Sequence, residues 1–502
     1  MRHFRTLSAM TLSVCLLTFA ADAQHDADAT NTNLQTDPRA IQVILSPNAQ
    51  VLSTFMGLGI QFDPYRDAPS PERWQIIKQR VVWAHPGFLR VISPAEDFFL
   101  GFDTQGKPIF VWQHPTPASE QRFHNLLAIL DFAQQHDISV YLGESRPPRA
   151  LGFDSVTDAR WPAIVADFMD YLIHVRHYKV IQHYIFFNEP DGPWEWPDSA
   201  PDFDAWSKGI RNLRRDLDAH SLQQLAITGP DNSSMPDAPG EINLTWLDRS
   251  VKMLHEEFGS WEMHLYPTDA QIFGGEVETI LKRAKQTILN NDPNGARKEL
   301  FLAESGLLTG KIDALDQQPR VHTFSYGVEM ADYVAQVVAA GWMGADAFHL
   351  DDAKLSNSNK PKLWGFWDSS PESDMAIRPW FYTWSLMSRL FPGGARMVTV
   401  GSTPVSSRFR AVAAHWTNGV GVQTTVMLVN DSDTPRTVEL SRQGLEGNAL
   451  TVYHYFSDDR PVNSKGFPVP AAVLTFKRKG SPLMLRMPSA GVIFVTTVPP
   501  TT

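Results

Sequence analysis

The sequence predicts an α/β protein: a (β/α)8 TIM barrel with an additional antiparallel β-sandwich domain. Between residues 55 and 391, short apolar runs alternate with stretches whose apolar residues recur three and four positions apart, as on one face of a helix. From residue 392 onward the runs stay short and are separated by Gly, Pro, Asn, Asp and Ser. The chain has 502 residues, 43% of them hydrophobic, which is enough for one large core and one smaller core.

The first segment has the pattern of an export signal. Two arginines precede an apolar stretch at 7–20, and small residues follow it, which predicts a signal peptide at 1–23 that is cleaved after Ala23. The stretch is short for a membrane span, and no longer one follows. Cys15 is the only cysteine and would leave with the signal. We therefore expect a secreted or periplasmic protein without disulfides.

The segment before the barrel divides into a leader and a pair of strands. Residues 24–40 are polar and predict a disordered leader. Two short apolar pieces around residues 46–48 then predict a hairpin. A closed barrel leaves no place for these strands, so we expect the segment 41–54 to cross back and join the C-terminal sandwich.

Eight apolar runs in the segment 55–391 predict the barrel strands. Helical patterns lie between them, such as the one at 119–136, whose apolar residues form a single face. A doubly wound open sheet is disfavoured because Gly57-Leu58-Gly59 lacks the third glycine of a phosphate-binding loop. The predicted strands are Phe55–Phe62, Phe88–Ser93, Ile138–Gly143, Val180–Phe187, Leu225–Gly229, Trp261–Tyr266, Leu300–Ala303 and Ala345–Leu350.

The segment 392–502 predicts the sandwich, because it has many short strand patterns and no helical period. We expect this domain to support the barrel. An independent carbohydrate-binding role stays open, although the segment has no clear aromatic stripe.

The fourth and the seventh predicted strands each end at a glutamate. The run at 184–187 leads into Asn188-Glu189-Pro190, and the run at 300–303 leads into Glu304. In a parallel barrel the carboxyl ends of the strands meet at one face, where catalytic groups lie. A retaining glycosidase uses two carboxyl groups about 5 to 5.5 Å apart, one to protonate the leaving oxygen and one to attack the anomeric carbon.

The Asn188-Glu189-Pro190 triplet, with Glu304 three β-α units later, resembles the retaining glycoside hydrolases of clan A. This group includes the cellulase, xylanase, β-xylosidase and glucocerebrosidase families. The resemblance implies that Glu189 is the general acid/base and Glu304 the nucleophile. It covers the barrel in layout and a handful of positions in motif, and it implies no cofactor. The sequence also has no zinc-binding motif.

Four further residues match clan A positions at strand ends. The resemblance implies that Arg90 bonds the nucleophile and that Asn188 contacts the sugar 2-hydroxyl. His264 and Tyr266 resemble the His-x-Tyr of the sixth strand, with the tyrosine directed at the nucleophile.

Residues in the loops after the strands are candidates for substrate binding. Trp194 and Trp196 follow the acid/base, and Trp364 and Trp367 follow the eighth strand. These rings either pack against sugar faces or anchor their loops on the barrel. Glu144, after the third strand, either binds hydroxyls or pairs with a neighbour.

The sequence thus predicts an exported retaining β-glycosidase that acts on an oligo- or polysaccharide. The net charge of −11, without a Lys/Arg cluster, argues against nucleic acid or an anionic membrane as a partner. Two alternatives remain: an endo-acting β-glycanase of the same clan, and a non-catalytic carbohydrate-binding protein on the same fold. The sequence does not give the sugar, the linkage or the oligomeric state.

Overall fold

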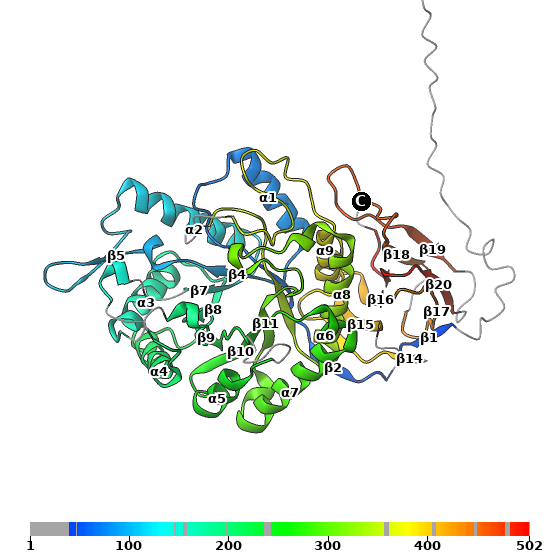
Figure 1. The fold of residues 1–502 in the computed structure, drawn as a ribbon, viewed down its shortest axis with the longest axis horizontal. Helices are drawn as coiled ribbons and strands as arrows, with labels where there is room; N and C mark the ends of the chain where they lie inside the picture. The colour runs from blue at the N-terminus through cyan, green and yellow to red at the C-terminus, as the bar shows by residue number, and fades with distance from the viewer. Residues whose placement is uncertain are drawn as a thin grey trace, which may run out of the picture.

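Eight parallel strands close into a barrel, and helices surround it (Figure 1). The computed structural model describes residues 40–500 except 47, 145–146, 148, 154–157, 197–198, 235–241, 356–360, 404–407, 446–448 and 477–481. The barrel closes where β12 pairs in parallel with β3, from Gly344 opposite Gly57 to Ala347 opposite Ile60. The strands, in order round the barrel, are Gly57–Gln61 (β3), Phe88–Ile92 (β4), Ser139–Gly143 (β7), Ile181–Ile185 (β8), Ala226–Pro230 (β9), Phe258–Leu265 (β10), Leu300–Ser305 (β11) and Gly344–Ala347 (β12). The predicted barrel is confirmed.

The helices form because each has an apolar face that is buried, and several of them begin at a residue whose side chain accepts a backbone N–H. In α2, the Thr116 side chain accepts the backbone N–H of Ser119, and Phe123, Leu126 and Leu130 are buried. The helices are Pro71–Ala84 (α1), Pro117–Gln135 (α2), Arg160–Asp170 (α3), Phe203–Ala219 (α4), Thr245–Met253 (α5), Asp269–Gly274 (α6), Glu276–Asn291 (α7), Phe324–Ala339 (α8) and Trp380–Leu390 (α9).

A small hairpin interrupts the barrel between β4 and α2. It consists of Phe99–Phe102 (β5) and Pro108–Phe110 (β6), and it projects from the barrel at the left of Figure 1. These two short strands were not predicted from the sequence.

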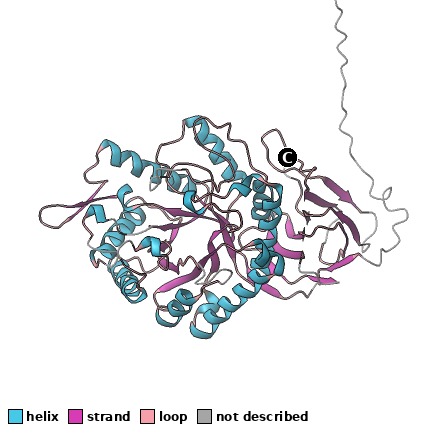
Figure 2. Ribbon diagram, in the orientation of Figure 1, coloured by secondary structure: helices cyan, strands magenta, loops and turns pink. Residues whose placement is uncertain are grey.

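The second domain is a sandwich of two β-sheets, on the right in Figure 2. The smaller sheet has the order β14-β1-β17-β20, and the larger one β19-β18-β21-β16-β15-β13-β2. Apolar residues of both sheets, such as Val43, Val438, Leu428 and Ile493, share one core. The strands are Ile41–Ile44 (β1), Val51–Thr54 (β2), Arg396–Val398 (β13), Gly401–Thr403 (β14), Phe409–Asn418 (β15), Gly421–Asn430 (β16), Arg436–Leu440 (β17), Ala449–Tyr455 (β18), Ala472–Thr475 (β19), Leu483–Met487 (β20) and Gly491–Thr496 (β21).

Both strands at the start of the described chain lie in the sandwich, but they do not form a hairpin. β1 pairs with β14 and β17, whereas β2 pairs with β13 in the other sheet. The predicted hairpin around residues 46–48 is therefore wrong. The apolar pieces are strands, but each one fills a place in a different layer. The β1–β17 pair is parallel, in a domain whose other strand pairs are antiparallel.

The sandwich is fixed to the barrel along α8. Arg410 of β15 forms an ion pair with Asp332 of α8 at 2.5 Å, and the Tyr455 hydroxyl of β18 donates to the carbonyl of Phe324 at 3.0 Å. Buried apolar residues of β16 and β21 belong to the same core cluster as those of α8. The two domains therefore share an apolar interface.

The predicted signal peptide at 1–23, and all but the last residue of the predicted leader at 24–40, lie outside the described residues. Within the described part of the chain, none of the helices combines the length and the apolar character that crossing a membrane requires.

Candidate active site

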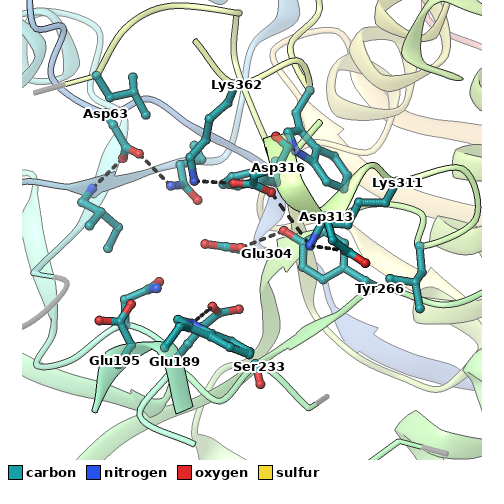
Figure 3. A pocket seen from close by; sticks show the side chains of 18 residues that line it. Asp63, Glu189, Glu195, Ser233, Tyr266, Glu304, Lys311, Asp313, Asp316 and Lys362 are labelled. Carbon is teal, nitrogen blue, oxygen red and sulfur yellow. Dashed lines mark hydrogen bonds and ion pairs between the residues drawn. The ribbon is translucent and has the colours of Figure 1, made fainter. Parts of the chain in front are cut away.

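A cavity of about 650 Å³ lies at the carboxyl ends of the barrel strands (Figure 3). Its walls are formed by the residues that end the strands and by the loops that follow them. The lining residues are Gln61, Asp63, Ile92, Asn188, Glu189, Trp194, Glu195, Ser233, Tyr266, Glu304, Leu308, Lys311, Asp313, Asp316, Phe348, Leu355, Lys362 and Trp364.

Glu189 and Glu304 face each other across this cavity. Glu189 follows β8, and Glu304 is the next-to-last residue of β11. One carboxylate oxygen of Glu189 lies within 4.8 Å of one carboxylate oxygen of Glu304. This spacing is close to the roughly 5 to 5.5 Å of retaining glycosidases and shorter than the roughly 6.5 to 9.5 Å of inverting ones, which leave room for a water.

Both oxygens of Glu304 are held by donors. Arg90 Nη1 donates to Oε1 at 2.6 Å, and the Tyr266 hydroxyl donates to Oε2 at 2.7 Å. Arg90 is on β4 and is fully buried, and Tyr266 directly follows β10. Two hydrogen bonds of this kind fix the plane of the carboxyl group.

Arg90 joins four strand ends into one network. Besides Glu304, its guanidinium donates to Gln61 Oε1 at 2.6 Å, to Asn188 Oδ1 at 2.7 Å and to Asp231 Oδ2 at 2.9 Å. Burial lowers the pKa of Arg90, but the charges of Asp231 and Glu304 outweigh it and raise the pKa above its usual range. The fork of a guanidinium is suited to several acceptors at once.

His264, the second buried cation, bridges the two glutamates. Its Nδ1 is 3.0 Å from Glu189 Oε1 and 3.5 Å from Glu304 Oε2, while its Nε2 is 3.1 Å from Asp231 Oδ1. Burial lowers the pKa of His264, but the charges of Glu304 and Asp231 and the bonds to Asp231 and Glu189 raise it well above its usual value. The direction of this shift favours the charged ring, which can donate from both nitrogens.

The backbone of Glu189 has an unusual conformation for a residue with a side chain. Its φ of 48° lies in the left-handed region, and its N–H donates to the carbonyl of Asp231 at 2.9 Å. The loop after β8 is thereby tied to the end of β9, and the carboxyl is turned into the cavity. Its Oε2 accepts a hydrogen bond from Trp194 Nε1 at 3.1 Å.

Two more buried carboxyl groups lie close to Arg90. Burial and the charge of Asp231 raise the pKa of Glu262 well above its usual range. Burial likewise raises the pKa of Asp346, and neither of its carboxyl oxygens has a hydrogen-bond partner among the described residues. Both shifts favour the neutral acid. The charged groups beneath the cavity are then mainly the cations Arg90 and His264 and the carboxylates that they contact.

The wall of the cavity opposite Glu189 is built from two loops, one after β11 and one after β12, and an ion pair joins them. Lys362, in the loop after β12, is 2.9 Å from Asp316 Oδ2, and Lys311 is 3.6 Å from Asp313 Oδ1. Trp364 Nε1 donates to the carbonyl of Asp316 at 3.0 Å. Figure 3 shows Lys362 and Asp316 across the cavity from Glu189, with Glu304 between them in this view.

The structure brings most of the predicted site residues together. Glu189, Glu304, Asn188, Tyr266, Trp194 and Trp364 line the cavity. Arg90 and His264 lie behind the glutamates and contact their carboxyl groups, but they are fully buried and outside the lining. The resemblance implied that Arg90 bonds Glu304, and the structure has this contact. The contacts of Arg90 and His264 are those of positioning residues.

Three predicted residues are buried and lie outside the cavity lining. Trp196 is buried, and its indole N–H donates to the carbonyl of Pro190 at 2.8 Å, so it anchors its own loop. Trp367 is fully buried, with the guanidinium of Arg80 over its ring at 4.7 Å. Glu144 is also buried and outside the lining, and its carbonyl accepts the N–H of Asn188. A position just past a strand end does not fix the direction of its side chain.

Several residues of the site were not predicted. Asp231 accepts from both Arg90 and His264, yet in the sequence it follows Gly229-Pro230 and has the pattern of a turn. Asp63, after β3, accepts the backbone N–H of Ile92 and a hydrogen bond from Gln61. A search for acidic residues at every strand end would have found both aspartates.

Two groups of side chains have the composition of metal ligands. One is Glu189, His264 and Glu304, and the other is Asp231, Glu262 and His264. Both contain His264, whose Nε2 is only 3.2 Å from the Arg90 guanidinium. The positive charge that a metal ion would bring is thus already supplied by Arg90 and the imidazolium, and the carboxylates are bonded to them.

Comparisons with known proteins place the fold. No protein-family model and no curated protein matches the sequence. A GH30 endoxylanase from Clostridium papyrosolvens C71 has a TM-score of 0.61 and 13% identity over 91% of this chain and 99% of the other. A GH39 β-xylosidase from Caulobacter crescentus has 0.59 and 13% over 92% and 100%, and a glucosidase from Croceicoccus marinus has 0.59 and 12% over 92% and 99%. The chain therefore has the barrel-plus-sandwich fold of GH30 and GH39 glycoside hydrolases, and the predicted resemblance to clan A is confirmed at the level of fold.

Proposed function

We propose that this protein is a retaining β-glycosidase, with Glu304 as the nucleophile and Glu189 as the general acid/base. The observation that carries the proposal is the pair of carboxyl groups on opposite sides of one cavity, with oxygens within 4.8 Å of each other. At this spacing no water fits between Glu304 and an anomeric carbon, so the carboxylate itself attacks.

The reaction runs in two displacements. In the first, a Glu304 oxygen bonds to the anomeric carbon, the glycosidic C–O bond breaks, and Glu189 gives its proton to the leaving oxygen. In the second, Glu189 takes a proton from water, the water oxygen bonds to the anomeric carbon, and Glu304 leaves. The imidazolium of His264, 3.0 Å from Glu189 Oε1, stabilises Glu189 as the anion that the second step requires.

The neighbours of the glutamates orient the sugar as well as the carboxyl groups. A guanidinium can only donate, so Arg90 must bind the side-chain amide of Asn188 through the amide oxygen. The amide NH2 of Asn188 is then left to donate to a sugar hydroxyl in the cavity. Such a bond strengthens in the transition state and lowers the barrier.

The wall opposite Glu189 supports action on the end of a glycan chain. The leaving group lies beside the acid Glu189, so the sugar that becomes bonded to Glu304 extends away from it. In that direction lies the wall that contains Lys362 and Asp316, whose ion pair joins the loop after β12 to the loop after β11. We infer that a wall at this place limits the cavity to a terminal sugar.

The charge of the cavity supports a neutral sugar. The lining among the described residues contains two lysines, and both are close to aspartates. The acidic lining residues are Asp63, Glu189, Glu195, Glu304, Asp313 and Asp316. A sugar carboxylate would therefore enter a negative field. A like charge at close range costs several kcal/mol of binding free energy, and each 1.4 kcal/mol or so corresponds to about a tenfold lower rate.

The test is a panel of aryl β-glycosides and short β-linked oligosaccharides. The names of the structural relatives make the β-xyloside and the glucoside the first choices. We expect turnover with retained anomeric configuration, observed by NMR, and a β-glucuronide cleaved at least about 100-fold more slowly than the best neutral sugar. Azide should restore Glu189→Ala on a dinitrophenyl glycoside by forming the β-glycosyl azide, because this leaving group needs no proton.

The outcomes separate the alternatives. An inverted product contradicts the assignment of Glu304 as nucleophile. Preferred cleavage inside long polysaccharides contradicts chain-end action and leaves an endo-acting glycanase. Binding of a glycan without turnover, unchanged in Glu304→Gln, leaves a carbohydrate-binding protein.

We also propose that the protein is exported, on the strength of the sequence pattern at 1–23. Expression of the full chain in a Gram-negative host should give an extracytoplasmic protein whose N-terminal residue, by sequencing, is Gln24. Recovery of an uncleaved chain from the cytoplasm alone would contradict the proposal.

A further inference from the structure

The loop that follows Glu189 presents one half-exposed indole to the carboxyl of that residue. Trp194 has 46% of its surface exposed and lines the cavity, and its Nε1 donates to Glu189 Oε2 at 3.1 Å. The other oxygen, Oε1, is bound by His264 from the buried side. Each oxygen of Glu189 is thus held by one donor, one from the barrel interior and one from the cavity mouth.

The ring of Trp194 packs directly against a glycine, Gly192. A Cβ added to Gly192 would lie 2.3 Å and 2.5 Å from two ring carbons of Trp194, so the indole rests directly on the Gly192 backbone. Gly192 has φ −78° and ψ 125°, which any residue adopts without strain. The position needs glycine for room rather than for its backbone conformation.

The loop itself is fixed at several points. The N–H of Gly192 donates to the carbonyl of Glu189 at 2.9 Å, and Trp196 is anchored on Pro190. Asp191 accepts from the N–H of Ser233 at 2.7 Å. Trp194 is therefore held at the carboxyl group by a rigid loop.

We propose that Trp194, seated on Gly192, is the residue that positions Glu189 for proton transfer to the leaving oxygen. The inference rests on the proposed function. A carboxyl oxygen has two lone-pair directions, so Oε2 accepts the indole N–H on one side while it carries or receives the catalytic proton on the other. Together with the contact of His264 to Oε1, the hydrogen bond from the indole N–H fixes the rotation of the carboxyl group about its last torsion, which is soft in a free side chain. The step needs no movement of the ring.

The test measures kcat/KM for two substrates of the same sugar in Trp194→Phe. Phenylalanine keeps an aromatic ring but has no N–H. Proton transfer is required for an alkyl β-glycoside and not for the dinitrophenyl glycoside. We expect kcat/KM to fall about 10- to 100-fold for the alkyl glycoside and to stay within about twofold for the dinitrophenyl glycoside, since general acid catalysis contributes roughly 10²- to 10⁴-fold.

Gly192→Ala repeats the test without changing the tryptophan. The added methyl group displaces the ring from its position on Gly192, so kcat/KM should again fall for the alkyl glycoside and not for the dinitrophenyl glycoside. The double variant should be no worse than the more impaired single variant, because both act through one contact. Matched controls are Trp416→Phe on β15 and Gly419→Ala, whose added methyl meets no atom within 4 Å; both should behave as wild type.

The contradicting results are distinct from those of the proposed function. If wild type cleaves both substrates and Trp194→Phe lowers both rates equally, or neither, Trp194 does not position the acid. If wild type cleaves no substrate of the panel, the proposed function fails and this inference fails with it.

Discussion

Replacing Glu304 with glutamine is expected to lower kcat/KM on a dinitrophenyl β-glycoside by about 10⁵-fold, the order of loss seen when a catalytic nucleophile is removed. The amide keeps the size of the side chain and one acceptor oxygen, but it carries no negative charge to attack the anomeric carbon. Arg90 and Tyr266 then have a neutral partner where they bind an anion in wild type. The activated leaving group isolates this defect, because it needs no proton from Glu189.

A covalent adduct distinguishes loss of the nucleophile from general damage. Wild type incubated with a 2-fluoro glycoside of the preferred sugar, with a good leaving group, should gain the mass of one sugar on the peptide that contains Glu304. Glu304→Gln should gain none. Glu278→Gln, a change in the first turn of α7 where the side chain pairs with Lys282, serves as the control and should label and turn over as wild type does. An adduct on any other carboxyl group would reassign the nucleophile.

The barrel was predictable because its strands are buried on both faces. Such strands are continuous apolar runs, and all eight predicted runs contain or overlap a strand of the barrel. Glu189 and Glu304 were predictable for the same reason. A carboxyl group that interrupts a buried run at its carboxyl end is expensive to desolvate unless something uses it.

The remaining site residues depend on contacts that the sequence does not display. Asp231 is one of several aspartates in turn-like segments until the closure of the barrel brings it to Arg90 and His264. The tryptophans show the same limit. Trp194 and Trp196 are two positions apart in one loop, yet one donates to the carboxyl group of Glu189 and the other to a backbone carbonyl. Only the turn at Gly192 decides between them.

Replacing Arg90 with methionine should impair folding and activity together. Methionine fills a similar volume, but it leaves Asp231 and Glu304 buried without their cation. Breaking a buried ion pair from one side typically costs about 3 to 5 kcal/mol of unfolding free energy. Loss of the bonds to Glu304 and Asn188 should lower kcat/KM by about 10³-fold or more, since misplacing catalytic groups by about 1 Å already costs about 10²-fold. Urea unfolding and the dinitrophenyl assay measure the two effects.

The stability loss in Arg90→Met should depend on pH in a definite direction. In wild type, burial raises the pKa of Asp231, but Arg90 and His264 lower it below its usual value, so the carboxylate stabilises the fold at neutral pH and that contribution is lost as the pH falls through the depressed pKa. Without Arg90 the folded protein binds a proton more readily at this site. The stability difference between wild type and Arg90→Met should thus be largest near neutral pH and shrink as the pH approaches about 4. A difference that stays constant with pH would mean that lost packing, not the unpaired charge, causes the destabilisation.

Arg90→Lys separates charge from geometry in the same experiment. The ammonium restores a cation beside Asp231 and Glu304, so it should recover much of the unfolding free energy. It cannot recover the activity, because a single ammonium does not span Gln61, Asn188, Asp231 and Glu304, which the planar guanidinium contacts through two nitrogens. If the activity of Arg90→Lys is close to that of wild type, the site needs only a positive charge at this position. The orientation of Asn188 and Glu304 is then set by other contacts.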